Sequence, residues 1–194
     1  MIVLASQSGS RRAMFSAAGI PFTAQPAHVD ERALEAALGD ALPADVALAL
    51  AQAKAQDVSR GTSGALVLGS DSLVSCAGRR FDKPASRDDA AAHLRFFSGK
   101  VMELHSAAAL VRDGELLWAE SAVAQLHVAP LSDSFIEGYL DEEWPEVGGC
   151  VGVFRIEGRG VQLFERIEGD YFTILGMPLL KVQAALRELG ALTR

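Results

Sequence analysis

Cysteine is scarce in this sequence, which has only Cys76 and Cys150 among its 194 residues. Two cysteines are too few for a disulfide framework. Neither stands in a CxxC pair or near a histidine at metal-ligand spacing. We therefore expect ordinary core or surface thiols rather than a zinc site.

Long hydrophobic runs are also lacking. No apolar stretch approaches the roughly 18 residues that a membrane span needs. The apolar opening from Met1 to Ala5 has no basic segment before it, so no signal peptide is expected. These absences favour a soluble, cytoplasmic protein without a membrane partner.

Positive charge is in deficit, with 18 Lys and Arg against 25 Asp and Glu and a formal net charge of −7. A nucleic-acid polymer would require a basic field, so none is expected as a partner. A small anionic ligand in a local pocket is still allowed. The 49% hydrophobic composition is that of a globular protein, and at about 150 residues per domain the length predicts one domain, 1–194.

Several familiar catalytic motifs are missing. The sequence has no GxSxG elbow, no Walker loop and no GxGxxG. Its four histidines are scattered, and no Cys–His signature is present. Nucleophilic catalysis by a serine or cysteine is therefore not favoured.

Helices and strands alternate along the chain, which predicts an α/β protein with a mixed sheet. A strand over residues 2–5 leads through small residues into a helix from about Arg11, with Ser8 or Ser10 as its N-cap. A second strand, residues 65–68, is expected to end at Gly69-Ser70-Asp71. Gly19 is expected to end the first helix. The Ala-rich stretch over 33–55 is expected to be helical, with Pro43 in a first helical turn and Gly61 closing the helix that contains Lys54. The remaining expectations are helices over 87–97, 132–140 and from 178, a hairpin over 101–128, and strands near 161–166 and 172–175.

The opening strand, loop and helix form the first candidate site. Small residues let backbone N–H groups approach an anion, and the helix N-terminus attracts one. Arg11 and Arg12 add charged donors in the first helical turn, where cations are normally disfavoured. The alternative is an ordinary solvated turn.

Asp71 and Glu31 are the candidate acids. An acid directly after a buried strand stands where open α/β sheets bind their ligands, although an Asx turn would look the same. Glu31 could act as a second oxygen donor for a divalent ion. Its alternative is a charged helix start.

Lys54 and Lys83 are the candidate cations. Lys54 continues an apolar stripe on its helix, and Lys83 precedes Pro84, which favours an extended backbone there. Either residue alone could equally be a surface lysine.

These segments together resemble the Maf family of nucleotide pyrophosphatases, nearly from end to end. The resemblance is carried, in order, by Leu4-Ala5-Ser6-Gln7-Ser8-Gly9-Ser10-Arg11, Val29-Asp30-Glu31, Lys54-Ala55, Gly69-Ser70-Asp71, Lys83-Pro84, residues 94–99, residues 152–158, Gly169-Asp170-Tyr171 and Gly176-Met177-Pro178-Leu179.

The resemblance implies a fold like that of inosine triphosphate pyrophosphatases, with a mixed twisted sheet, flanking helices and two lobes around a cleft. It implies hydrolysis of a nucleoside triphosphate to the monophosphate and pyrophosphate with a divalent cation, Mg²⁺ or Mn²⁺. Asp71 would be the catalytic proton acceptor and would bind the metal together with Glu31. The phosphates would be bound by Ser8, Arg11, Lys54 and Lys83. A homodimer is left open.

Three residues depart from the family pattern and bear on the choice of base. Ser10 stands where the opening motif has an arginine, a role that Arg12 could take over. Ser72 replaces the threonine usual in members that act on thymidine and uridine triphosphates. Glu157 resembles the branch that acts on 7-methylguanosine triphosphate, which favours a purine.

Two other functions stay open at this stage. The missing arginine at Ser10 would suit a nucleotide-binding regulatory module, linked to cell division and without significant turnover. A pyrophosphatase of the inosine triphosphate type would share the reaction and differ in its motifs.

Overall fold

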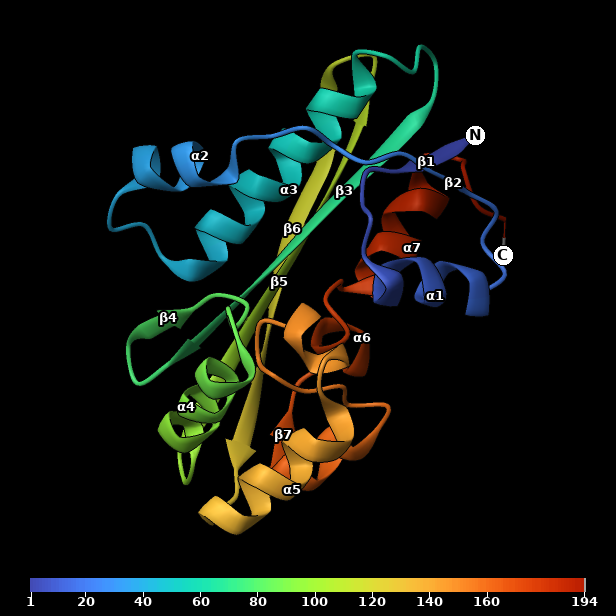
Figure 1. Ribbon diagram of the computed structural model, residues 1–194. Coiled ribbons are helices and arrows are strands. Elements are labelled where there is room, and N and C mark those ends of the chain that lie inside the picture. The colour runs from blue at the N-terminus through green and yellow to red at the C-terminus, as the bar shows by residue number, and fades with distance from the viewer. Residues whose placement is uncertain (194) are drawn as a thin grey trace. The chain divides into compact units, whose positions relative to one another are not determined.

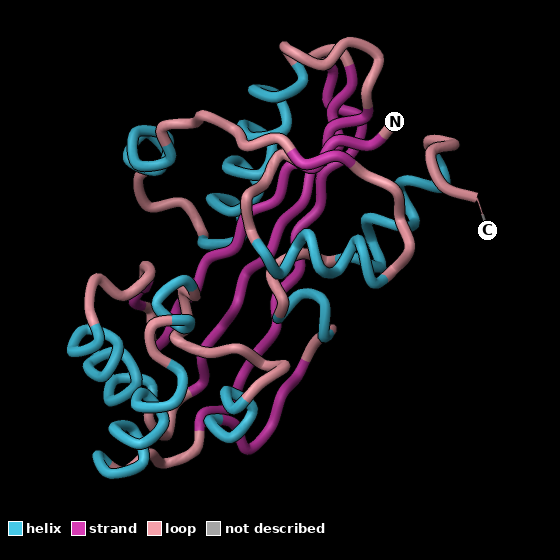
Figure 2. The backbone as a smooth tube through the Cα atoms, turned by 45° about the vertical axis from the view of Figure 1, so that its right-hand side comes forward, coloured by secondary structure: helices cyan, strands magenta, loops and turns pink. Residues whose placement is uncertain are grey.

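The computed structural model describes residues 1–193, which form two compact units (Figure 1). Unit 1 consists of Met1–Ser72, His105–Ala122 and the segment from Tyr171 onward. Unit 2 consists of Leu73–Leu104 and Val123–Asp170. The long strands β3, β5 and β6 contribute residues to both units (Figure 2).

The strands form one mixed seven-stranded sheet in the order β2-β1-β3-β5-β6-β7, with β4 paired to β3. β1 runs parallel to both of its neighbours, whereas the β3–β4 and β6–β7 pairs are antiparallel. This confirms the α/β class with a mixed sheet. The strands are β1 (Ile2–Leu4), β2 (Thr23–Ala24), β3 (Leu66–Cys76), β4 (Arg79–Phe81), β5 (Val101–Arg112), β6 (Glu115–Val128) and β7 (Phe164–Glu168).

In unit 1, the sheet is buried on both faces, which explains the apolar runs of β1 and β3. Alternate residues of the two strands enter two separate hydrophobic clusters, because successive side chains point to opposite faces. Leu4 and Leu68 pack with α1 and α7, whereas Val3 and Val67 pack with α3. The helices of this unit are α1 (Gly9–Ala17), α2 (Glu31–Leu38), α3 (Pro43–Ser59), α6 (Tyr171–Ile174) and α7 (Leu179–Glu188).

In unit 2, α4 (Arg87–Phe97) packs on α5 (Asp133–Glu143). Arg87 donates to the carboxylates of Glu137 and Asp141, so an ion-pair network joins the two helices. Two 3₁₀ turns, Glu146–Gly149 and Arg159–Leu163, interrupt the glycine-rich segment.

Most of the expected elements are confirmed, and some are corrected. Ser8, and not Ser10, caps α1. The Ala-rich stretch is helical as expected and is divided by residues 39–42, and Pro43 opens α3, which confirms its place in a first helical turn. The strand expected near 172–175 is wrong, since these residues belong to the short helix α6 and its end. The strand expected near 161 begins at Phe164, after a 3₁₀ turn.

Among residues 1–193, none of the helices combines the length and the apolar character needed to cross a bilayer.

Candidate active site

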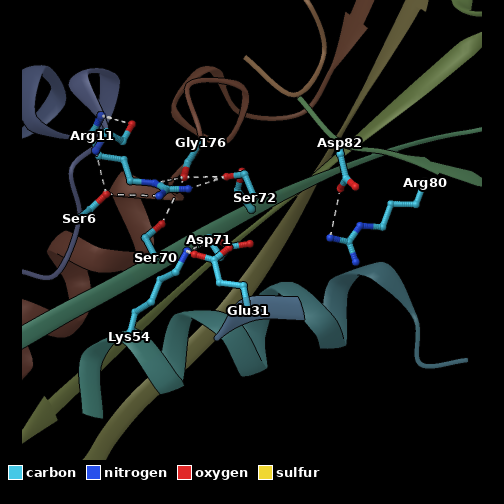
Figure 3. Close-up of polar contacts among 12 residues, drawn as sticks. Ser6, Arg11, Glu31, Lys54, Ser70, Asp71, Ser72, Arg80, Asp82 and Gly176 are labelled. Carbon is cyan, nitrogen blue, oxygen red and sulfur yellow. Dashed lines mark hydrogen bonds and ion pairs between the residues drawn. The ribbon is translucent and has the colours of Figure 1, made fainter. Parts of the chain in front are cut away.

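Glu31, Lys54 and Asp71 form the charged centre of unit 1 (Figure 3). Lys54 Nζ lies 2.5 Å from Asp71 Oδ1 and 2.8 Å from Glu31 Oε1. Asp71 is buried, with 7% of its surface exposed, whereas the side chain of Glu31 is 47% exposed. One ammonium group therefore joins a buried acid to an acid that still reaches solvent.

A close contact between β3 and α3 produces this pairing. A Cβ atom at Gly69 would lie 2.0 Å from the carbonyl oxygen of Ala51 and 2.7 Å from the amide nitrogen of Ala55. The strand can therefore approach the helix only because residue 69 has no side chain. Asp71 points to the same face as residue 69, since side chains alternate along a strand, and there it meets Lys54.

The position of Asp71 corrects one expectation. β3 does not end at Gly69-Ser70-Asp71 but continues to Cys76, so Asp71 is an interior strand residue. Polar residues normally terminate a buried strand, but here each of the three has a role within the packed interior. Residue 69 contacts α3, Ser70 donates to the carbonyl of Gly176, and Asp71 pairs with Lys54.

Glu31 is the first residue of α2, and Asp30 caps this helix by accepting from the amide of Ala33. Glu31 is therefore a charged helix start, which the sequence also allowed. The same placement also brings the carboxylate of Glu31 to Lys54. Glu31 can thus begin the helix and still take part in the charged site.

Arg11 lies in the first turn of α1, and its guanidinium donates three hydrogen bonds. Its Nε donates to the carbonyl of Gly176 at 2.9 Å, Nη2 to Ser72 Oγ at 3.0 Å and Nη1 to Ser6 Oγ at 3.4 Å. Burial lowers the pKa of Arg11 from its ordinary value, and the carboxylates of Asp71 and Glu31 act in the opposite direction. The guanidinium therefore belongs to the same charged cluster as the acid–lysine pairs.

Ser8, Ser10 and Arg12 lie around the start of α1 in different environments. Ser8 Oγ accepts from the amide of Arg11 at 3.4 Å, whereas Ser10 is exposed. Arg12 lines an open groove of about 530 Å³ together with Phe22, and the lining of this groove does not include Arg11. Arg12 therefore lies along this groove, whereas Arg11 contacts Gly176 and Ser72.

Gly176, Ser70 and Ser106 complete the site and were not singled out from the sequence as site residues, whereas Ser72 was expected to bear on the choice of base. The Gly176 carbonyl accepts from Arg11 and from the Ser70 hydroxyl, and Ser72 Oγ lies within hydrogen-bonding distance of both this carbonyl and Ser106 Oγ. Gly176 adopts a φ of +101°, a backbone conformation that favours glycine. Small hydroxyl residues on a buried strand could have indicated the site. Nothing in the sequence indicated that Ser72 lies against Gly176, which is 104 residues away.

Lys83 and Glu157 belong to unit 2, where both are exposed. Burial raises the pKa of the Cys150 thiol above its ordinary value. Glu157 raises it further, whereas Arg155 and Lys83 lower it. Lys83 and Glu157 thus act electrostatically on the same thiol. Beside them, Arg155 forms an ion pair with the buried Glu143 at 2.8 Å.

Within the described part of the chain, no group of three or more His, Cys, Asp or Glu residues is arranged to hold a metal ion. Glu31 and Asp71 supply two carboxylates that converge on Lys54. Mg²⁺ commonly takes one or two protein carboxylates and completes its shell with water and substrate phosphates. This donor pair fits such an ion.

The fold and this site define an α/β protein with a charged centre suited to an anionic ligand. The family model described as "Maf-like protein" matches residues 1–189, and the chain belongs to this family.

Relatives with assigned names match over nearly the whole chain. The chain is 51% identical over 194 residues to a 7-methyl-GTP pyrophosphatase of Rhizobium meliloti (strain 1021), covering 99% of this chain and 98% of the relative. It is 45% identical to a nucleoside triphosphate pyrophosphatase of Nitrobacter winogradskyi, covering 96% and 92%. A solved structure of a HAM1 protein from Coxiella burnetii is 19% identical, with a TM-score of 0.44 and coverage of 67% and 73%.

Proposed function

We propose that the protein hydrolyses nucleoside triphosphates to the monophosphate and pyrophosphate. As a Maf-like protein with pyrophosphatases among its relatives, it is a hydrolase that acts on an acid anhydride. The observation that carries the proposal is the buried Asp71 paired with Lys54, with Arg11 in the same charged cluster. A module that only bound nucleotide would not require a buried acid beside its cations.

Asp71 is the candidate general base. A water attacking the α-phosphorus must lose a proton as the new P–O bond forms, and a carboxylate within about 3 Å can accept it. The bond from the α-phosphorus to the bridging oxygen then breaks, and its electrons remain on the pyrophosphate. Cationic donors stabilise this developing negative charge.

Lys54 and Arg11 each have N–H groups that can donate to the negative charge developing on the pyrophosphate. Two of the three N–H groups of Lys54 can serve its two carboxylates, which leaves one for a phosphate oxygen. Arg11 uses three of its five N–H groups on Gly176, Ser72 and Ser6. Each of its two terminal nitrogens therefore keeps one N–H, and we assign these to the phosphates, together with Ser8 and Lys83.

A divalent cation fits the carboxylates of Glu31 and Asp71. When bound there with substrate phosphates, it would supply charge neutralisation that lowers repulsion between the acids and the triphosphate. Without it, two negative side chains would face a strongly negative substrate. Mg²⁺ and Mn²⁺ are the proposed cofactors.

For the base, we propose a purine, and 7-methylguanosine triphosphate in particular. The Rhizobium relative with 51% identity is named for this substrate. The exposed carboxylate of Glu157 can accept from the N1–H and amino groups of guanine, which a pyrimidine does not offer in the same arrangement. Ser72 is engaged with Arg11 in this structure, so Glu157 is the better candidate for reading the base.

The direct experiment is a pyrophosphate-release screen of the full chain with Mg²⁺ or Mn²⁺, across the standard triphosphates, inosine triphosphate and 7-methylguanosine triphosphate. Turnover of at least one nucleotide, with a stoichiometric monophosphate product, is expected. Tight nucleotide binding without pyrophosphate release over hours would reject the enzyme and favour the regulatory module. Preference for inosine triphosphate would reject 7-methylguanosine as the preferred base, and preference for a pyrimidine nucleotide would reject a purine.

Glu157→Gln tests the base assignment separately. Loss of the carboxylate should lower kcat/KM for 7-methylguanosine triphosphate by about tenfold, the scale of one charge-assisted hydrogen bond, while other triphosphates change less. Glu165→Gln, an exposed glutamate of the same unit, is the matched control. An equal loss for every nucleotide would show that Glu157 does not read the base.

A further inference from the structure

Ser106 is a fully buried serine on β5 that the proposed mechanism does not use. Its Oγ lies 2.9 Å from Ser72 Oγ and donates to the carbonyl of Thr173 at 2.8 Å. Ser72 in turn accepts from Arg11. A path of hydrogen bonds therefore leads from the guanidinium into the interior of unit 1.

The number of hydroxyl protons fixes the direction of this path. Ser72 and Ser106 have one proton each, yet they make three contacts that could use one: with the Gly176 carbonyl, with the Thr173 carbonyl and with each other. The Gly176 carbonyl has two lone pairs and already receives Arg11 Nε and the Ser70 hydroxyl. Its need for a third donor is therefore the weakest of the three.

In the remaining arrangement each hydroxyl proton has an acceptor, and the Gly176 carbonyl keeps its two other donors. Arg11 Nη2 donates to Ser72, Ser72 donates to Ser106, and Ser106 donates to the Thr173 carbonyl. In this order the lone pair of Ser72 Oγ faces the guanidinium. A buried polar chain is rigid when each member is satisfied.

We propose that Ser106 is a positioning residue: its buried hydroxyl orients Ser72 as the acceptor for Arg11 and so fixes the guanidinium for binding phosphates. Besides the longer bond from Nη1 to Ser6, Arg11 is held by Nε on Gly176 and by Nη2 on Ser72, which together define the plane of its fork. Loss of Ser106 frees the proton of Ser72 to turn, and the bond from Nη2 to Ser72 loosens. The role of Arg11 in phosphate binding rests on the proposed function.

The test measures the affinity of the full chain for inorganic triphosphate by calorimetry. Ser106→Ala should weaken binding about fivefold to tenfold, which is the scale of one misplaced hydrogen bond. Ser106→Thr, which keeps the hydroxyl, should stay within about twofold of the wild type. Ser59→Ala is the matched control, since it removes another buried serine hydroxyl of unit 1, one that accepts from the amide of Gly114. It should not change the affinity.

A double-mutant cycle with Arg11→Met separates positioning from a general loss of structure. If Ser106 acts through Arg11, Ser106→Ala should change the affinity less than about twofold in the Arg11→Met background. An equal loss in both backgrounds, or no loss in the wild type, would overturn the proposal. Failure of the wild-type chain to bind inorganic triphosphate would overturn it as well.

Pyrophosphate release from 7-methylguanosine triphosphate, measured on the same variants, keeps the two proposals apart. With turnover, Ser106→Ala should raise KM more than it lowers kcat, because Arg11 is assigned to binding. No turnover combined with the expected affinity cycle would reject the proposed function and leave the positioning role of Ser106 supported.

Discussion

Asp71 combines two properties that strands rarely give to one carboxylate, namely burial and a direct ammonium partner. A buried charge is tolerated when it is paired, and removing one partner from such a pair is costly. Lys54 has a second acid in Glu31, so the ammonium would stay paired if Asp71 lost its charge. This makes an isosteric substitution at Asp71 informative about chemistry rather than folding.

Asp71→Asn should lower kcat for pyrophosphate release by about 10²–10⁴-fold, the usual contribution of a general base. The fold should persist, with a circular dichroism spectrum like that of the wild type. Asp45→Asn, in the first turn of the same helix that carries Lys54, is the control and should retain full turnover. Wild-type turnover by Asp71→Asn would contradict the assignment.

The two thiols make stability depend on pH. Burial raises the pKa of both Cys76 and Cys150, so the folded protein keeps protons that the unfolded chain releases above a pKa of about 8.5. The free energy of unfolding should therefore fall as the pH rises past that value. Urea denaturation at pH 7.5 and 9.5 measures the slope, and replacing both cysteines by alanine should flatten it. An unchanged slope would contradict the role of the thiols.

At the scale of elements, the site depends on the distance between α3 and β3. Gly69→Ala would place a methyl group within 2.0 Å of the Ala51 carbonyl, and backbone atoms would have to move. We expect a loss of about 3 kcal/mol in unfolding free energy by urea denaturation, together with reduced turnover, because Lys54 would shift from Asp71. Gly61→Ala, whose Cβ would have only the Val58 carbonyl near it, at 3.9 Å, should be nearly neutral. Similar stability of the two variants would contradict this account.

The sequence predicts where most helices and strands begin and end, but it does not predict which distant residues pack against them. Ser8, Gly19 and Pro43 marked helix boundaries correctly because capping and turn chemistry act within a few residues. The sequence predicts a shorter β3 than the structure has, because a glycine followed by two polar residues is typical of a strand end unless its packing partners are known. The strand predicted near 172–175 is wrong because a short apolar run fits a buried strand or a helical turn equally well.

For the site, charge and order along the chain were enough to name Glu31, Lys54, Asp71 and Arg11, which unit 1 brings together. The serine contacts of Arg11 could not be named, because a serine has no charge that marks it and occurs in many surface loops. Arg12 was a candidate to replace the missing arginine of the opening loop. Whether it does so stays a prediction, though it lines a groove that does not include Arg11.

At the scale of the molecule, the net charge of −7 opposes capture of a triphosphate. Binding therefore depends on the local cations and on the proposed divalent ion. Removal of divalent ions with EDTA should abolish pyrophosphate release, and added Mg²⁺ or Mn²⁺ should restore it. The melting temperature should change little, because Lys54 already pairs with both carboxylates without a metal. Full activity in EDTA would reject the cofactor.

The contact between Arg11 and the carbonyl of Gly176 joins positions 165 residues apart. A ribosome adds about 5–20 residues per second, so the N-terminal arginine waits on the order of ten seconds or more for its acceptor to be synthesised. During that time the nascent chain can carry the opening motif and the acid–lysine pair, but its guanidinium is not yet oriented. Assembly of the phosphate-binding fork is thus a late event in the biosynthesis of this protein, and a chain stalled before residue 176 would lack it.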